Sequence, residues 1–252
     1  MTDFDPSGLS DRLVRREVEL DRRPPVLLPP EHRDSMRAAA AEIEECYRVL
    51  EKGGSNVVAD LLRGQGVFSE WNHYPPGDVY DSASHAQYYY HAHPSPLREG
   101  EHGHFHTFLR VQGMAKGVKP IKMPEAVDRP LGPKALGHLI GISMNRHGRP
   151  IRLFTVNRWV TGESWYKARD VIAMLDRFAI DHANPSWPAN RWITAMLRLF
   201  RPQVEWLIGE RDQAVRLWQA GRPDVTAYED RELEVLSSLP IVVEDHIRLV
   251  RS

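Results

Sequence analysis

The sequence predicts an α+β fold, with a central antiparallel sheet of hairpins flanked by N-terminal and C-terminal helices. Near both ends of the chain, apolar residues recur at three- and four-residue steps, which is the period of a helix. Between these ends, residues 67–112 are rich in aromatic, histidine and turn residues, a composition that favours strands and ordered loops. Helices and strands that are separated along the chain in this way are typical of α+β proteins.

The first 30 residues predict an extended arm. Residues 1–23 are strongly charged and lead into the proline-rich segment PPVLLPP at 24–30. We expect this arm to be poorly ordered or to lie against a partner, so a homo-oligomer could form through it. Residues 31–252 are then expected to form a single α+β domain, because this length suits one large domain.

Two helices are expected directly after the arm. Apolar residues at helical spacing predict a helix over 31–50, and Gly53 and Gly54 supply its stop. Ser55 could cap a second, short helix over 57–62, which Gly64 and Gly66 would end.

Two hairpins are expected next, a histidine-rich one within 67–112 and a second one within 138–159. The second turns at residues 146–149. Opposed residues of an antiparallel pair have numbers with a constant sum, and a sum of 295 places Ile142 opposite Leu153 and Met144 opposite Ile151. The remaining residues, 164–236, are expected to form helices over 164–178, 188–200, 202–220 and, more weakly, 229–236.

The bulk composition excludes several classes of function. With 33 basic and 34 acidic residues, the formal net charge is -1, so no global field favours nucleic acid or an anionic membrane. The sequence has no secretory h-region and no run of 18 apolar residues, so we expect a cytoplasmic protein without a membrane partner. The single cysteine, Cys46, rules out an intrachain disulfide and a thiolate metal cluster.

The most informative motif is YYYHAHPSPLREGEHGHFH, in which five of the twelve histidines are spaced as H-x-H and H-x-H-x-H. Strand side chains alternate between faces, and Pro94 and Gly100 mark a turn between the two groups. An odd register sum would place His91 opposite His104, His93 opposite His102 and Tyr89 opposite His106. All five imidazoles would then share one face, whereas an even sum would split the set.

A row of imidazoles on one face predicts a metal site, because neutral rings offer facing acceptors and protonated rings repel one another. The preferred ligands are His91, His104 and His106, with His102 as a further candidate and His93 closer to the turn. Three histidines on adjacent strands resemble the zinc site of carbonic anhydrase and the iron site of three-histidine oxygenases. Iron is slightly favoured over zinc, because the surroundings are rich in histidine and tyrosine and hold no thiolate.

Several neighbouring residues are candidates for catalysis or substrate binding. Glu101 could act as a ligand or general base, although a solvated loop carboxylate is the competing interpretation, and Tyr89 and His93 could contact the reacting group. Aromatic residues could wall a pocket for a small-molecule substrate: Trp71, Tyr74, Tyr88 and Tyr90. Arg158 could clamp a substrate carboxylate or phosphate beside Asn157. Glu70, His73, Asp78, Asp81 and His85 are further candidates, although Asp78 is better explained as a turn residue.

Three functions remain open at this point. The first is a metal-dependent enzyme that acts on a small molecule through a histidine-ligated iron or zinc. The second is a protein that binds a transition metal or haem without turnover. The third is a structural, pH-responsive histidine cluster whose rings repel one another when they are protonated.

The stretches EWNHYPPGDVYD, YYYHAH, GEHGHFHTFLR and LFTVNRWVTGESWY are similar to those of an uncharacterised bacterial family, a domain of unknown function. This resemblance covers most of the chain after the N-terminal arm. It implies no activity, ligand or catalytic residue.

Overall fold

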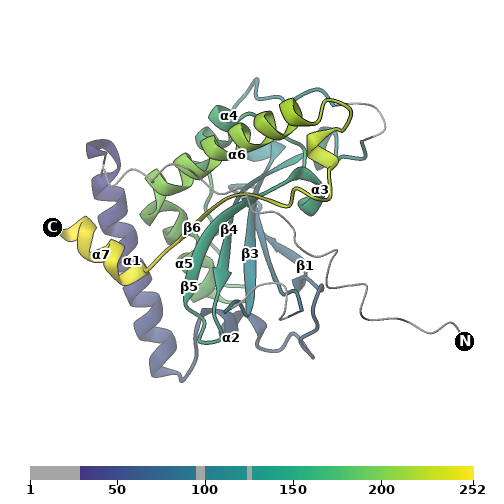
Figure 1. The fold of residues 1–252 in the computed structure, drawn as a ribbon. Coiled ribbons are helices and arrows are strands. Elements are labelled where there is room, and N and C mark those ends of the chain that lie inside the picture. The colour runs from purple at the N-terminus through teal and green to yellow at the C-terminus, as the bar shows by residue number, and fades with distance from the viewer. Residues whose placement is uncertain (1–28, 95–99, 124–126) are drawn as a thin grey trace, which may run out of the picture.

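The computed structural model describes residues 29–94, 100–123 and 127–252. Most of the predicted arm, residues 1–28, therefore lies outside the described residues, as does an oligomer contact through it. The described residues form one antiparallel sheet with helices before and after it, which confirms the predicted α+β class (Figure 1). Among the helices of the described residues, none has the length and apolar character that a membrane span requires.

The sheet is a meander in which each strand pairs with the next along the chain, in the order β1-β2-β3-β4-β5-β6. The strands are β1 (Tyr74–Tyr80), β2 (Ala86–His91), β3 (Gly103–Arg110), β4 (Leu136–Met144), β5 (Pro150–Val156) and β6 (Val235–Pro240). The α-helices are α1 (Arg33–Lys52), α2 (Val57–Leu62), α3 (Arg158–Thr161), α4 (Ala168–Leu175), α5 (Trp187–Leu199), α6 (Arg201–Gly221) and α7 (Val243–Arg251). Short 3-10 helices cover Pro30–His32, Val111–Gly113, Gly132–Lys134 and Ala227–Glu229.

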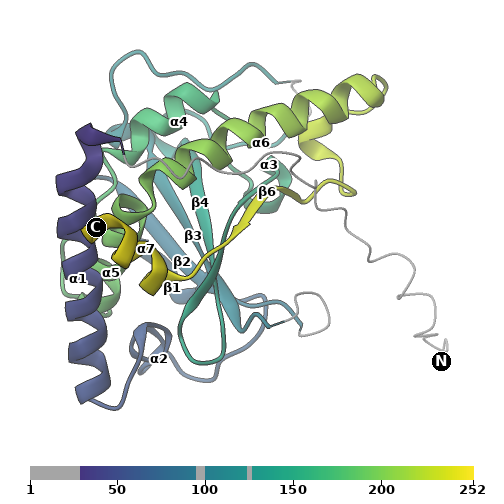
Figure 2. The same ribbon diagram turned by 60° about the vertical axis from the view of Figure 1, so that its left-hand side comes forward.

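Helices α4, α5 and α6 pack on one face of the sheet, and α1 packs on α5, as the view in Figure 2 also shows. The contacts are made by alternate strand residues. Tyr88 donates a hydrogen bond to Asn190 of α5, and Phe105 packs against Trp192 of the same helix. We call this the helix face, and the opposite face, which carries His91 and His104, the histidine face. The main hydrophobic core lies between the helix face and the helices.

Most predicted elements are confirmed, with local corrections. The cap of α2 is Asn56 and not Ser55, because the Asn56 side chain accepts the hydrogen bond from the Ala59 N–H. In the second hairpin Ile142 pairs with Leu153 as predicted, but a register shift after Ser143 pairs Met144 with Pro150.

The C-terminal region differs most from the prediction. The helix expected over 229–236 is wrong, since the chain there ends a 3-10 turn at Glu229 and enters strand β6 at Val235. Ser237 of β6 pairs with Thr155 of β5 through both backbone and hydroxyl groups, so the sheet takes up this segment. A final helix, α7, follows and was not predicted.

Candidate metal centre

The register between β2 and β3 has the odd sum on which the predicted site depends. Tyr89 pairs with His106, and His91 pairs with His104. Directly opposed residues of an antiparallel pair point to the same face, so His91, His104 and His106 gather on the histidine face. The side chains of His104 and His106 are fully buried, and His91 is nearly so.

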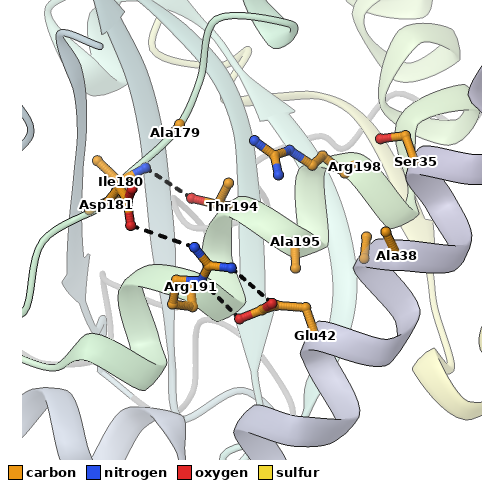
Figure 3. Close-up of a pocket in the computed structure, with 11 residues that line it drawn as sticks. Ser35, Ala38, Glu42, Ala179, Ile180, Asp181, Arg191, Thr194, Ala195 and Arg198 are labelled. Carbon is orange, nitrogen blue, oxygen red and sulfur yellow. Dashed lines mark hydrogen bonds and ion pairs between the residues drawn. The ribbon is translucent and has the colours of Figure 1, made fainter. Parts of the chain in front are cut away.

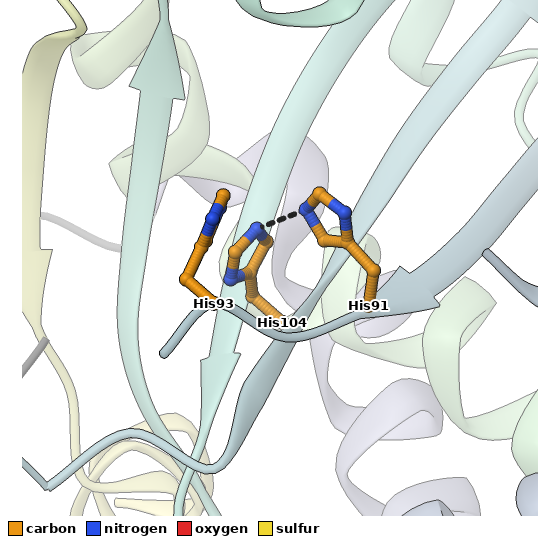
Figure 4. A group of neighbouring side chains, drawn as sticks. All are labelled: His91, His93 and His104. Atoms are coloured by element: carbon orange, nitrogen blue, oxygen red, sulfur yellow. Dashed lines mark hydrogen bonds between the residues drawn. The ribbon is translucent and has the colours of Figure 1, made fainter. Parts of the chain in front are cut away.

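Three imidazoles converge closely enough to hold a metal ion: His91, His93 and His104 (Figure 4). Each offers one ring nitrogen, and these nitrogens all lie within 4.8 Å of one another. The His91 and His104 Nε2 atoms are 2.6 Å apart, and the rings of His93 and His104 stack with their centroids 5.2 Å apart. The predicted trio is therefore corrected at one position, where His93 replaces His106.

His106 lies beside this trio but is paired with another histidine. Its Nδ1 is 2.9 Å from Nε2 of His138, on the neighbouring strand β4. Burial, together with the positive charge of Arg211, lowers the pKa of His138 to about 3, so this ring stays neutral. The prediction did not include His138 in the site. The sequence feature that could have suggested His138 is its position at the start of the second predicted hairpin.

Glu101 lies against His104. Its Oε1 is 2.6 Å from Nδ1 of His104, and both side chains are almost completely buried. With the Glu101 carboxylate as the acceptor of this hydrogen bond, Nδ1 of His104 is the donor, and its Nε2 presents a lone pair to the trio. The alternative of a solvated loop carboxylate is therefore wrong for Glu101.

His102 is not part of the cluster, which corrects its prediction as a ligand. Its Nδ1 is 2.7 Å from the hydroxyl of Tyr90, and its ring stacks on Phe68. Strand β3 begins only at Gly103, so the alternation of faces does not extend back to His102. A Cβ at Gly103 would lie 2.5 Å from the Tyr90 hydroxyl, so glycine gives that hydroxyl the space to reach His102.

Of the four residues predicted as an aromatic wall, Trp71 faces the cluster, and so does Tyr89, which was predicted as a catalytic residue. The Tyr89 ring stacks on His73 at a centroid distance of 3.6 Å and lies 5.3 Å from both His91 and His106. Trp71 meets His93 edge-on at 4.4 Å. Burial raises the pKa of Tyr89, so its hydroxyl remains protonated and can donate a hydrogen bond.

The other predicted wall residues have structural roles elsewhere. Tyr88 lies on the helix face, Tyr90 bonds to His102, and the Tyr74 hydroxyl bonds to the backbone of Val67 and Ser69. These three tyrosines therefore do not line the histidine trio, which corrects their assignment as substrate contacts. The alternation rule separates Tyr89 from Tyr88 and Tyr90, so this outcome was readable from the sequence.

The side chains of Asn157 and Arg158 also form hydrogen bonds with other residues of the protein. Asn157 caps α3 and donates to the carbonyls of Ala227 and Leu233. Arg158 is buried and pairs with Glu229 through two nitrogens, while a third donates to the backbone at Asp128 and Glu163. A substrate clamp at Arg158 is therefore not supported.

The remaining candidate residues do not belong to the trio. His73 pairs with Asp78 at 3.1 Å, His85 pairs with Tyr80 at 2.5 Å, and Asp81 accepts backbone hydrogen bonds from three residues. Glu70 is exposed. Of these, His73 is closest to the trio, with its ring 5.6 Å from that of His91.

A separate hollow of about 230 Å³ lies between α1 and α5 (Figure 3). Its central cation, Arg191, is bound at close range by Glu42 and at 3.5 Å by Asp181. Since two carboxylates neutralise this guanidinium, we interpret the hollow as part of the seam between the helices and not as an anion site.

Glu163 lies next to the histidine that contacts His106, because its Oε2 accepts a hydrogen bond from the backbone N–H of His138 at 2.5 Å. Burial raises the pKa of Glu163 to about 7, against the opposing effect of Arg211. A carboxyl group whose pKa is raised in the folded state stabilises the protein below its unfolded pKa, and this stabilisation is lost as the pH rises through the folded value.

We therefore expect the melting temperature to fall between pH 5 and pH 8, and the Glu163→Gln variant to fall less over that range. The neutral amide keeps an oxygen acceptor for the His138 N–H and cannot ionise. Thermal unfolding at half-unit pH steps measures the difference. Equal slopes for both proteins would contradict a Glu163 that ionises near pH 7.

Comparison with known proteins identifies a family for this fold and site. The family model described as a domain of unknown function (DUF6969) matches residues 37–241. No curated protein and no solved structure matches the chain. The matched residues include both hairpins, the trio His91, His93 and His104, and the chain as far as the end of β6. Because this match spans well over half of the sequence, the chain belongs to the DUF6969 family.

Proposed function

We propose that the protein is a metal-dependent enzyme that acts on a small molecule, with His91, His93 and His104 as the metal ligands. The main support is the buried contact of 2.6 Å between Glu101 Oε1 and His104 Nδ1. Metal-binding histidines almost always donate their other ring N–H to a carboxylate, a carbonyl or water, which fixes the tautomer and aims the ligand nitrogen. Glu101 does this for His104.

Metal binding requires the proton between His91 and His104 to move. With the lone pair of His104 at Nε2, the 2.6 Å contact with His91 has His91 as the donor. Two imidazoles that bind one zinc ion at about 2.0–2.1 Å in a tetrahedron stand about 3.3–3.4 Å apart, so these rings must separate by about 0.7 Å. The cation takes the place of this proton, which moves to Nδ1 of His91, so both rings bind the metal as neutral imidazoles.

Three protein ligands are the number found in catalytic zinc sites, where the fourth position takes water or substrate. Tyr89 and Trp71 stand next to the trio and could orient a small ligand at that position. Imidazole ligands suit iron and zinc alike, and we favour iron slightly because the donor set contains no thiolate. Iron would activate O2 at the open position, whereas zinc would supply hydroxide.

The first test is elemental analysis of protein purified without a histidine tag or a metal column. We expect about one equivalent of iron or zinc per chain, as three protein ligands to one ion imply. Glu101→Gln should weaken the metal affinity roughly 10- to 100-fold, which is the usual cost of removing an outer-shell carboxylate. The affinity is measured by competition with a chromophoric chelator.

Glu45→Gln provides the matched control. Glu45 is an exposed glutamate paired with Arg48 on α1, so its loss should leave metal affinity unchanged. Substoichiometric metal in the wild-type protein would rule out the proposal. If iron is bound but neither azide nor nitric oxide changes its spectrum, the site is saturated and the protein binds metal without turnover.

A further inference from the structure

The hydroxyl of Ser143 is a buried polar group on the histidine face. Ser143 lies on β4 directly opposite His104, and its side chain is fully buried. Among the described residues, its Oγ has no hydrogen-bond partner. A buried hydroxyl without a partner destabilises the folded state, so a fold rarely keeps one without a use for it.

The position of Ser143 follows from the strand register. The pairs His91 with His104 and His104 with Ser143 form one row across β2, β3 and β4. Directly opposed residues share a face, with Cβ atoms about 4.5–5.5 Å apart. The row therefore consists of two candidate ligands followed by a hydroxyl, with Ser143 outside the trio and next to His104 on the side away from His91.

Two neighbours of Ser143 on the histidine face, Gly141 and Phe154, have no polar side-chain atoms. Two residues away on the same face, β4 has Gly141, over which the ring of Phe154 packs so closely that a Cβ would lie 2.5 Å from it. Phe154 also contacts His104 edge-on at 5.4 Å. The ring of Phe154 has no oxygen or nitrogen that could accept a hydrogen bond from the Ser143 hydroxyl. The hydroxyl can therefore still donate a hydrogen bond to a bound ligand.

We infer that Ser143 binds the exogenous ligand of the metal, and that this ligand is a small anion with an acceptor atom, such as hydroxide or a carboxylate. The inference rests on the proposed function. A divalent ion, three neutral imidazoles and the Glu101 carboxylate carry a net charge of +1, which favours an anion at the open position. The Ser143 O–H would donate a hydrogen bond to that anion.

The test uses azide as the anionic probe and cobalt(II) as a spectroscopic metal. Wild-type protein, Ser143→Ala and Ser237→Ala are loaded with cobalt and titrated with azide. Ser237 is the matched control, because it is an equally buried strand serine whose hydroxyl bonds to Thr155 and to the Leu207 carbonyl. We expect Ser143→Ala to bind cobalt normally and azide about tenfold more weakly, as loss of one hydrogen bond to a charged group implies.

Stability provides a second readout that separates the two serines. Without metal, Ser143→Ala should melt no lower than wild type, because the lost hydroxyl has no partner, whereas Ser237→Ala should melt lower. Equal azide affinity for Ser143→Ala and wild type would overturn the inference, as would a cobalt protein that binds no azide. If the wild-type protein takes up no cobalt, the proposed function itself fails, and this is visible before azide is added.

Discussion

Replacing His104 by alanine should abolish stoichiometric metal binding, whereas replacing His102, two residues earlier, should leave it intact. His104 contributes one ligand of the trio and is the residue that Glu101 orients. Its loss should therefore cost more than the roughly 10- to 100-fold that removal of an outer-shell partner costs. His102 faces Tyr90 and Phe68 and has no part in the trio. Elemental analysis and chelator competition measure both variants.

Because His104 is fully buried, its replacement could also weaken the fold. His93→Ala removes a second ligand at a position that is only partly buried, and it should lose metal with little change in melting temperature. Metal retained by both His93→Ala and His104→Ala would show that the ion lies elsewhere. Equal metal loss in His102→Ala would show that metal binding depends on the whole hairpin and not on the trio alone.

The sequence predicted the location of this site because regular strands alternate strictly. Between Ala86 and His91, and from Gly103 onward, every residue lies on the face that its parity assigns, and the odd sum holds. Three of the residues that the structure reassigns lie just outside these strands. His93 follows the end of β2, while Glu101 and His102 precede the start of β3, and there the backbone is free of the alternation rule.

Long-range pairing explains the error at the C-terminal end. Leu233 and Leu236 have helical spacing, and local spacing alone cannot show that β5 would otherwise lack a partner on that side. Residues 235–240 become a strand because β5 supplies backbone partners and because Ser237 matches Thr155 across the pair. Strand preference depends on such context more than helix preference does.

The buried partners of the site could not be predicted in the same way. His138 reaches His106 only because β4 pairs with β3 through a register shift between His106 and Phe108. Arg158 was open to interpretation as a substrate clamp until Glu229, 71 residues further along the chain, was placed against it. Such pairings depend on topology and on loop paths, and no periodicity in the sequence encodes them.

Replacing Trp192 by alanine should destabilise the protein by about 3–5 kcal/mol, the usual cost of removing a buried tryptophan side chain. Trp192 is fully buried on α5, packs against Phe105 of β3 and donates a hydrogen bond to the Tyr47 hydroxyl at 3.1 Å. Its removal leaves a cavity between α5 and the sheet and takes a hydrogen-bond donor away from the Tyr47 hydroxyl on α1. Urea denaturation measures the change in the free energy of unfolding.

Trp187→Ala is the matched control for this prediction, since the same substitution in the same helix removes a ring that is 51% exposed. It should change stability by no more than about 0.5 kcal/mol, as surface substitutions usually do. Similar losses for both variants would contradict the core described between α5 and the sheet.

Phe105 lies between His104 and His106 on β3, so a cavity behind it loosens the strand that holds the cluster. Metal should therefore raise the unfolding midpoint of Trp192→Ala by less than it raises that of Trp187→Ala.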